Sequence, residues 1–145
     1  MEALLSGEGG RLILAIDEYE NSHAMAVDDR NWLRAALQVT AGPFQGSISL
    51  ALTTVELERL CRQVREIAKS LKGSLSFTTV EGDWDISLAL EGSSAVVVKG
   101  EVRSPDGDGS AVRYQFRTDP ITLETWAEKL GALVRKFPAV QGQPS

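Results

Sequence analysis

Residues 44–71 read FQGSISLALTTVELERLCRQVREIAKSL, and this stretch passes directly from a strand pattern to a helix pattern. From Phe44 to Leu52, apolar or small residues alternate with polar ones at the period of two that is typical of a half-buried strand. The following Thr53-Thr54-Val55-Glu56 matches a capping box, in which a threonine hydroxyl and a glutamate carboxylate accept hydrogen bonds from free backbone N–H groups. The stretch therefore predicts a strand that leads straight into a helix.

The helix is predicted to be amphipathic and to span about residues 54–72. Its apolar residues recur at spacings of three and four, which places them on one face. They are Leu57, Leu60, Cys61, Val64, Ile67, Ala68 and Leu71. We expect Gly73 to end the helix, because glycine enters the left-handed C′ conformation at little cost.

A second amphipathic helix is expected over about residues 120–137. Asp119 is a helix-capping residue, and Pro120 suits the first helical position, where its missing N–H group is not needed. The apolar stripe consists of Leu123, Trp126, Ala127, Leu130, Leu133, Val134 and Phe137. Pro138 should end this helix, and residues 139–145 are expected to form a disordered tail.

The remaining sequence reads as strands and turns. Apolar runs predict strands at residues 11–16, 31–40 and 44–52, and four more between residues 74 and 118. The fold class is therefore expected to be α+β, with about seven strands in one or two antiparallel sheets whose apolar face is covered by both helices. Residues 1–145 are expected to form a single domain.

Composition and charge restrict the class of function. The 145 residues are 43% apolar and 24% charged, as in ordinary globular proteins. The start has no basic region and no long apolar run, and a single cysteine cannot form an internal disulfide, so we expect a cytoplasmic protein with no membrane span. The net charge of −5 has the wrong sign for a general nucleic-acid binder.

Histidine and cysteine chemistry is limited to one residue of each type. His23 and Cys61 are too few for the usual zinc ligand sets, and they lie far apart in the sequence for a nucleophile and its base. Cys61 also falls on the apolar face of the first predicted helix, where a cysteine usually behaves as a small buried hydrophobe. We therefore expect neither residue to be catalytic.

Two groups of carboxylates are weak candidates for an acid–base site or a cation site. Glu81, Asp83 and Asp85 surround Trp84, but strand alternation puts Asp85 on the polar face. Asp106 and Asp108 resemble part of a calcium loop, although the glutamate that closes an EF-hand is missing and a hairpin loop is favoured. No catalytic residue, metal or cofactor is therefore predicted.

The longest irregular segment carries a local excess of carboxylates. The candidate partner-binding residues are Asp17, Glu18, Glu20, Asp28 and Asp29, together with Trp32 at the start of the next strand. Loops of this kind often carry function, and an exposed tryptophan can serve as an aromatic anchor. The alternatives are a solvated loop without a partner and, for Trp32, a place in the core.

Several segments taken together resemble the WapI-type immunity proteins of bacteria and their relatives. These segments are Asp29-Arg30-Asn31-Trp32-Leu33, Phe44 to Leu52 running into Thr53-Thr54-Val55-Glu56-Leu57, the later Phe77, Glu81 and Trp84, the closing Phe116 and Thr118-Asp119, and the helix end Lys136-Phe137-Pro138. The resemblance covers about residues 11–138. It implies a small β-rich domain with two helices that neutralises a cognate toxin by binding it.

Three classes of function stay open. The first is a non-enzymatic immunity protein whose partner is a basic toxin domain, with no nucleic acid and no membrane involved. The second is a structural or regulatory protein-interaction domain without a toxin partner, and the third is an enzyme with an unrecognised carboxylate site. Neighbouring genes would discriminate best, because a toxin immunity gene should lie directly downstream of a large secreted protein with a variable C-terminal domain.

Overall fold

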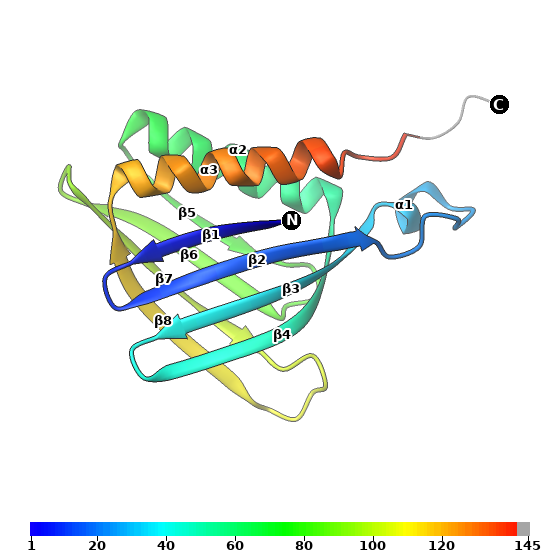
Figure 1. Cartoon of the computed structure of the whole chain (residues 1–145), viewed down its shortest axis with the longest axis horizontal. Helices are drawn as coiled ribbons and strands as arrows, with labels where there is room; N and C mark the ends of the chain where they lie inside the picture. The colour runs from blue at the N-terminus through cyan, green and yellow to red at the C-terminus, as the bar shows by residue number, and fades with distance from the viewer. Residues whose placement is uncertain (142–145) are drawn as a thin grey trace.

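Two antiparallel sheets and two long helices make up the fold, as Figure 1 shows for the computed structural model. The structure describes residues 1–141. Within them the elements are β1 (Glu2–Gly7), β2 (Gly10–Tyr19), α1 (Val27–Arg30), β3 (Trp32–Ala41), β4 (Phe44–Thr53), α2 (Thr54–Ser70), β5 (Ser74–Thr78), β6 (Trp84–Glu91), β7 (Ala95–Arg103), β8 (Ala111–Thr118) and α3 (Pro120–Lys136). The expected α+β class and both long helices are confirmed.

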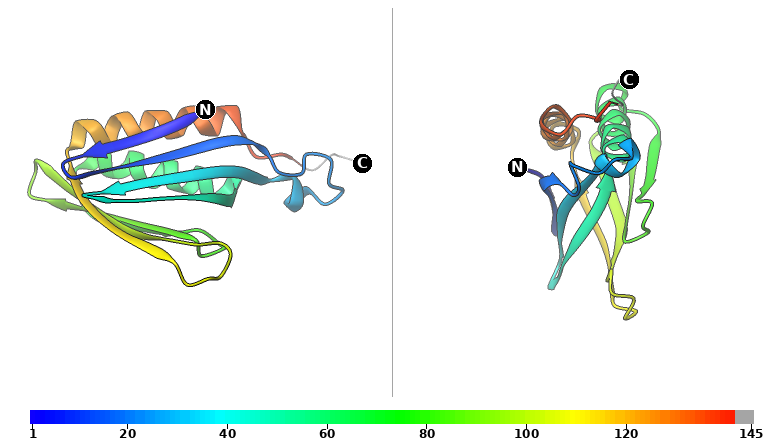
Figure 2. Two further views of the ribbon diagram at one scale, coloured as in Figure 1. Left: turned by 60° about the horizontal axis from the view of Figure 1, so that its bottom comes forward. Right: turned by 90° about the vertical axis from the view of Figure 1, so that its right-hand side faces the viewer.

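Each half of the chain forms the same motif, in which four strands are followed by one long helix. The sheets have the orders β1-β2-β3-β4 and β5-β6-β7-β8, so every strand pairs with its neighbour in the sequence. The two sheets approach each other on one side of the molecule and separate on the other, where α2 and α3 lie next to each other (Figure 2). The helices therefore close the wide side between the sheets.

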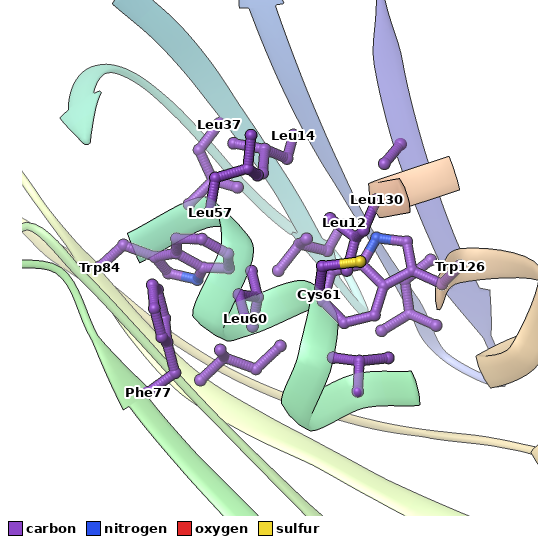
Figure 3. Packing of buried hydrophobic residues seen from close by; sticks show 14 of the residues in the cluster. Leu12, Leu14, Leu37, Leu57, Leu60, Cys61, Phe77, Trp84, Trp126 and Leu130 are labelled. Atoms are coloured by element: carbon purple, nitrogen blue, oxygen red, sulfur yellow. The ribbon is translucent and has the colours of Figure 1, made fainter. Parts of the chain in front are cut away.

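The apolar core is continuous across both halves because α2 lies between the sheets. Leu57, Leu60 and Val64 on the inner side of α2 are fully buried. Figure 3 shows side chains of α2 and α3 in one cluster with Leu37 of the first sheet and Trp84 of the second. Each fully buried side chain of this size contributes about 1.5–3 kcal/mol, so α2 is a main link between the halves.

The structure has eight strands within residues 1–141, one more than expected, because β1 was missed. In β1 only Ala3 and Leu5 point inward, while Leu4 between them is 45% exposed. Three adjacent apolar residues hide the period of two, so no alternation can be seen there in the sequence. β1 is a strand because it pairs with β2 along its whole length, from Glu2 opposite Ala15 to Gly7 opposite Gly10.

The helix starts agree with the sequence, but the expected end of α2 is wrong. Asp119 caps α3 by accepting a hydrogen bond from the Thr122 N–H at 2.8 Å. α2 ends at Ser70, and Leu71 rather than Gly73 takes the left-handed conformation at the cap, with φ of 56°. Local hydrogen bonds favour this end, because Leu71 N–H donates to the Ile67 carbonyl at 2.9 Å and Lys72 N–H donates to the Ser70 hydroxyl at 3.3 Å.

Glu56 joins the start of α2 to the second half of the chain. The expected capping box is present, since Glu56 N–H donates to the Thr53 hydroxyl at 3.1 Å and Thr53 N–H donates to the Glu56 carboxylate at 2.8 Å. The other carboxylate oxygen accepts from the N–H of Val80, after β5, at 2.7 Å. Glu56 is only 3% exposed, so these donors compensate the loss of water around its carboxylate.

Replacing Leu130 by alanine should lower the free energy of unfolding by about 2–5 kcal/mol, the usual range for a core leucine. Leu130 is fully buried in α3. Chemical denaturation of Leu130→Ala beside Lys129→Ala, a change at the exposed neighbouring position, measures this loss. Equal stabilities of the two variants would contradict the packing of α3.

Glu56→Gln should lower the free energy of unfolding by about 1–3 kcal/mol, because the amide NH2 group would face backbone donors that now find an acceptor. The matched control is Glu66→Gln, which makes the same chemical change at an exposed position of α2. Thermal and denaturant unfolding measure both. A loss in Glu56→Gln no greater than in Glu66→Gln would show that the Val80 and Thr53 contacts do not stabilise the fold.

Cys61 should react slowly with a thiol reagent in the folded protein and rapidly after unfolding. It is 5% exposed, and burial raises the pKa of its thiol while Arg65 and Arg135 act in the opposite direction. A Cys61→Ala, Ser70→Cys double variant, whose new thiol is at an exposed position, provides the fast reference. If native Cys61 reacted at the rate of that reference, its thiol would be accessible, and a catalytic role for Cys61 would have to be considered again.

Candidate binding surface

The predicted acidic residues lie at one end of the first sheet, in and around the connection from β2 to β3 (Figure 1). The sequence placed a loop directly after Ile16, but β2 continues to Tyr19. The register with β3 shifts between Ile16 and Glu18, so the extra residue Asp17 forms a bulge and pairing then resumes. Asp17 and Glu18 are therefore strand residues, and both are exposed.

Three of the predicted residues meet on the outer face of the first sheet. Glu18 lies opposite Arg34 and forms a salt bridge of 3.0 Å between Oε1 and Nη1. In the next row, Glu20 N–H donates to the Trp32 carbonyl at 2.8 Å. Trp32 alternates with the buried Leu33, which puts the tryptophan ring on the outer face, where it is half-buried. Glu18, Glu20 and Trp32 thus share one surface.

Asp28 and Asp29 lie in the single turn of α1, beyond the end of the sheet (Figure 1). Both are exposed, and within residues 1–141 neither has a cationic side chain at salt-bridge distance. The sequence did not predict α1. Its turn is short, and it is held by Asn31, whose side-chain Nδ2 donates to the Val27 carbonyl at 2.8 Å.

Asn31 fixes the acidic segment to two distant parts of the chain. Its Oδ1 accepts from the Thr54 hydroxyl at 2.8 Å, at the start of α2. The same side-chain amide forms two hydrogen bonds with the backbone of Val140. Its Oδ1 accepts from Val140 N–H at 2.7 Å, and its Nδ2 donates to the Val140 carbonyl at 3.1 Å. Of the expected tail, Val140 is therefore hydrogen-bonded, whereas residues 142–145 lie outside the described residues.

Tyr19 adds a second link between this surface and the end of α3. Its hydroxyl donates to the Pro138 carbonyl at 2.7 Å. Its ring packs edge-on against Phe137, with 5.7 Å between the ring centroids. Together with Asn31, Tyr19 holds the segment between β2 and β3 against the helix layer. The exposed carboxylates are thus carried on an anchored support.

The charge of this surface is strongly negative. Residues 17–34 contain five carboxylates against two guanidinium groups, those of Arg30 and Arg34. Within residues 1–141, no three His, Cys, Asp or Glu side chains gather in a way that could hold a metal ion. The negative charge of the surface suits hydrogen-bond donors and basic groups, and the half-buried Trp32 exposes apolar area beside it.

The histidine and cysteine lie in different surroundings. Cys61 is buried in the core, with its Sγ 3.9 Å from the Ala127 carbonyl, while His23 is exposed in the loop before α1. This arrangement agrees with the expectation of a core cysteine and a solvated histidine.

The other candidate carboxylates lie on the second sheet and in its turns. Asp85 lies on the outer face of the second sheet, as predicted, and is paired with Arg103. Asp108 accepts from Ser110 N–H at 2.8 Å inside the loop between β7 and β8, and this hydrogen bond lowers the pKa of the Asp108 carboxyl. Glu81 is exposed and Asp83 half-buried in the turn before β6.

Sequence reasoning missed the residues that hold the surface in place. Arg34 becomes the partner of Glu18 only through the register of β2 and β3, which the bulge at Asp17 changes. Asn31 and Tyr19 bond to residues more than a hundred positions away. One sequence signal could have pointed to Asn31 as an anchoring residue. It lies between an acidic run and a strand, inside the segment Asp29-Arg30-Asn31-Trp32-Leu33.

Within residues 1–141, no helix has both the length and the apolar character needed to cross a membrane.

Comparison with known proteins gives a similar fold and a family. A solved structure titled "Structure of the plant transcriptional regulator PBF-2" matches with a TM-score of 0.53, over 98% of this chain and 90% of that one, at 11% sequence identity. This likeness concerns the fold alone. No curated protein matches the sequence. The family described as Immunity protein WapI-like family matches residues 3–138, nearly the whole chain, and the chain therefore belongs to the WapI-like immunity protein family.

Proposed function

We propose that this protein is a cytoplasmic immunity protein that neutralises a cognate toxin domain by binding it, without catalysing a reaction. Membership of the WapI-like immunity family over residues 3–138 carries this proposal. The acidic surface supports it, because its carboxylates are exposed and are carried on a segment that Asn31 and Tyr19 anchor. An anchored surface loses little conformational entropy when it binds.

The proposed partner carries a basic surface. Toxins that cleave nucleic acid need a positively charged surface to hold phosphates, and an acidic inhibitor can bind to that same surface. Asp28 and Asp29 project from α1 without cationic partners in the described chain, so they are the residues best placed for long-range attraction. Glu18 contributes less, since Arg34 already compensates its charge.

A protein-interaction domain with no toxin partner is the alternative, and the neighbouring gene distinguishes the two functions. If a large secreted protein is encoded directly upstream, its C-terminal domain would be expressed in bacteria with and without this chain. We expect growth arrest by the toxin domain alone and growth in the presence of both. Arrest in both strains, although the proteins are folded and expressed, would refute immunity toward that toxin.

Exchanging Asp28 and Asp29 together for lysine should slow association with that toxin domain by at least about tenfold at low salt, and the difference should shrink at high salt. Stopped-flow or surface-based kinetics at two salt concentrations measure it. The matched control is Glu124→Lys with Glu128→Lys, which changes net charge equally at exposed positions of α3. If both double variants slow association to the same extent, the effect comes from net charge and the acidic surface is not the binding site.

A further inference from the structure

β4 is the outer strand of the first sheet, and within residues 1–141 it has a strand neighbour on one side only. The β3–β4 hairpin turns through Gly42 and Pro43, so Ala41 and Phe44 form its first hydrogen-bonded pair. Backbone groups then alternate along an antiparallel strand between the partner and the open side. The open-side groups belong to Gln45, Ser47, Ser49 and Ala51.

This edge lacks the features that usually prevent strand pairing. The sequence FQGSISLALT has no charged residue and no proline. Its register with β3 runs without a shift from Trp32 opposite Thr53 to Ala41 opposite Phe44, so no bulge distorts it. Natural edge strands are commonly protected by charge, proline, bulges or short length. A ten-residue strand without any of them is an available template for another strand.

The other three edges are shorter or covered. α3 runs beside β1 (Figure 1), and β8 crosses beneath the strands of the first sheet. Arg117 of β8 is also bridged to Glu8 in the turn between β1 and β2. β5 has only five residues. β4 is therefore the edge that combines length with an open side.

A groove of about 420 Å³ runs between β4 and the hairpin of β7 and β8. Figure 2 shows these two elements facing each other on the side away from the helices. Ser47, Ile48 and Ser49 line one wall, and Val102, Pro105 and Val112 line the other. The groove lies beside the open edge, and the hairpin wall would provide apolar contacts for the inner-face side chains of an added strand.

We propose that the β4 edge and this groove bind an extended segment of a partner protein, which adds to the first sheet as a fifth, antiparallel or parallel strand. The segment would alternate apolar residues, which face Val102 and Val112, with small or polar residues beside Ser47 and Ser49. Among the described residues that line the groove, Asp106 alone is charged, so a neutral or basic segment fits better than an acidic one. The inference does not depend on the partner being a toxin.

A synthetic peptide tests the edge directly. The probe is an octapeptide that is blocked at both termini. It has one lysine at each end and alternating valine and threonine between them. Its control has the same sequence with N-methyl groups on every peptide nitrogen, which removes the donors that face β4 in either strand direction. The full chain, labelled with ¹⁵N, is titrated with each peptide, and amide hydrogen exchange is measured in parallel.

We expect saturable shifts centred on residues 45–51 and at least tenfold slower exchange of the Ser47 and Ser49 amides with the unmodified peptide only. Ser49→Pro should abolish these effects without disturbing the β3–β4 ladder, because the Ser49 N–H group points to the open side. Ser49→Lys, which adds an edge charge, provides a second variant should proline disturb folding, and Gln115→Lys on β8 controls for the added charge.

Three results would overturn the inference. One is the absence of shifts at residues 45–51, and another is equal binding of the N-methylated peptide. The third is a free protein that sediments as a dimer and already protects the Ser47 and Ser49 amides, because the edge would then be occupied by a second copy of this chain.

Discussion

The fold depends on one helix being shared by two sheets. A four-stranded antiparallel sheet with an apolar inner face needs a cover, and α2 supplies that cover to both sheets at once through its fully buried Leu57, Leu60 and Val64. The direction of the helix is fixed at its first turn, where Glu56 accepts hydrogen bonds from Thr53 and from Val80. These contacts tie the end of β4 and the segment after β5 to the same turn of α2.

The two halves share a topology but differ in the connection between their middle strands. In the second half, β6 and β7 are joined by a tight turn of residues 92–94, whereas residues 20–31 of the first half form a longer connection that contains α1. The acidic surface thus lies on an elaboration of the repeated motif rather than on the motif itself. Scaffolds commonly carry binding residues on such connections, because a loop can change without disturbing the packed strands.

The elements with strong local signals could be predicted from the sequence. The capping box at Thr53 and the Asp119-Pro120 start located both long helices, and the alternation from Phe44 to Leu52 located β4. β1 could not be found, because it becomes a strand only by pairing with β2. The acidic residues of the candidate surface could be named from the sequence. The residues that anchor them, Asn31 and Tyr19, could not be, because their hydrogen-bond partners lie more than a hundred positions away.

The sharing of α2 has a consequence for cooperativity. If the chain were cut between Lys72 and Gly73, the first fragment would keep α2 but lose the sheet that covers one side of it. The second fragment would keep a sheet whose apolar face is open, because α3 packs on α2 and β1 of the first fragment. Neither fragment would bury enough apolar surface to offset the entropy of ordering its strands. The duplicated appearance of the fold therefore does not make it modular, and slow hydrogen exchange in both sheets should report a single global opening.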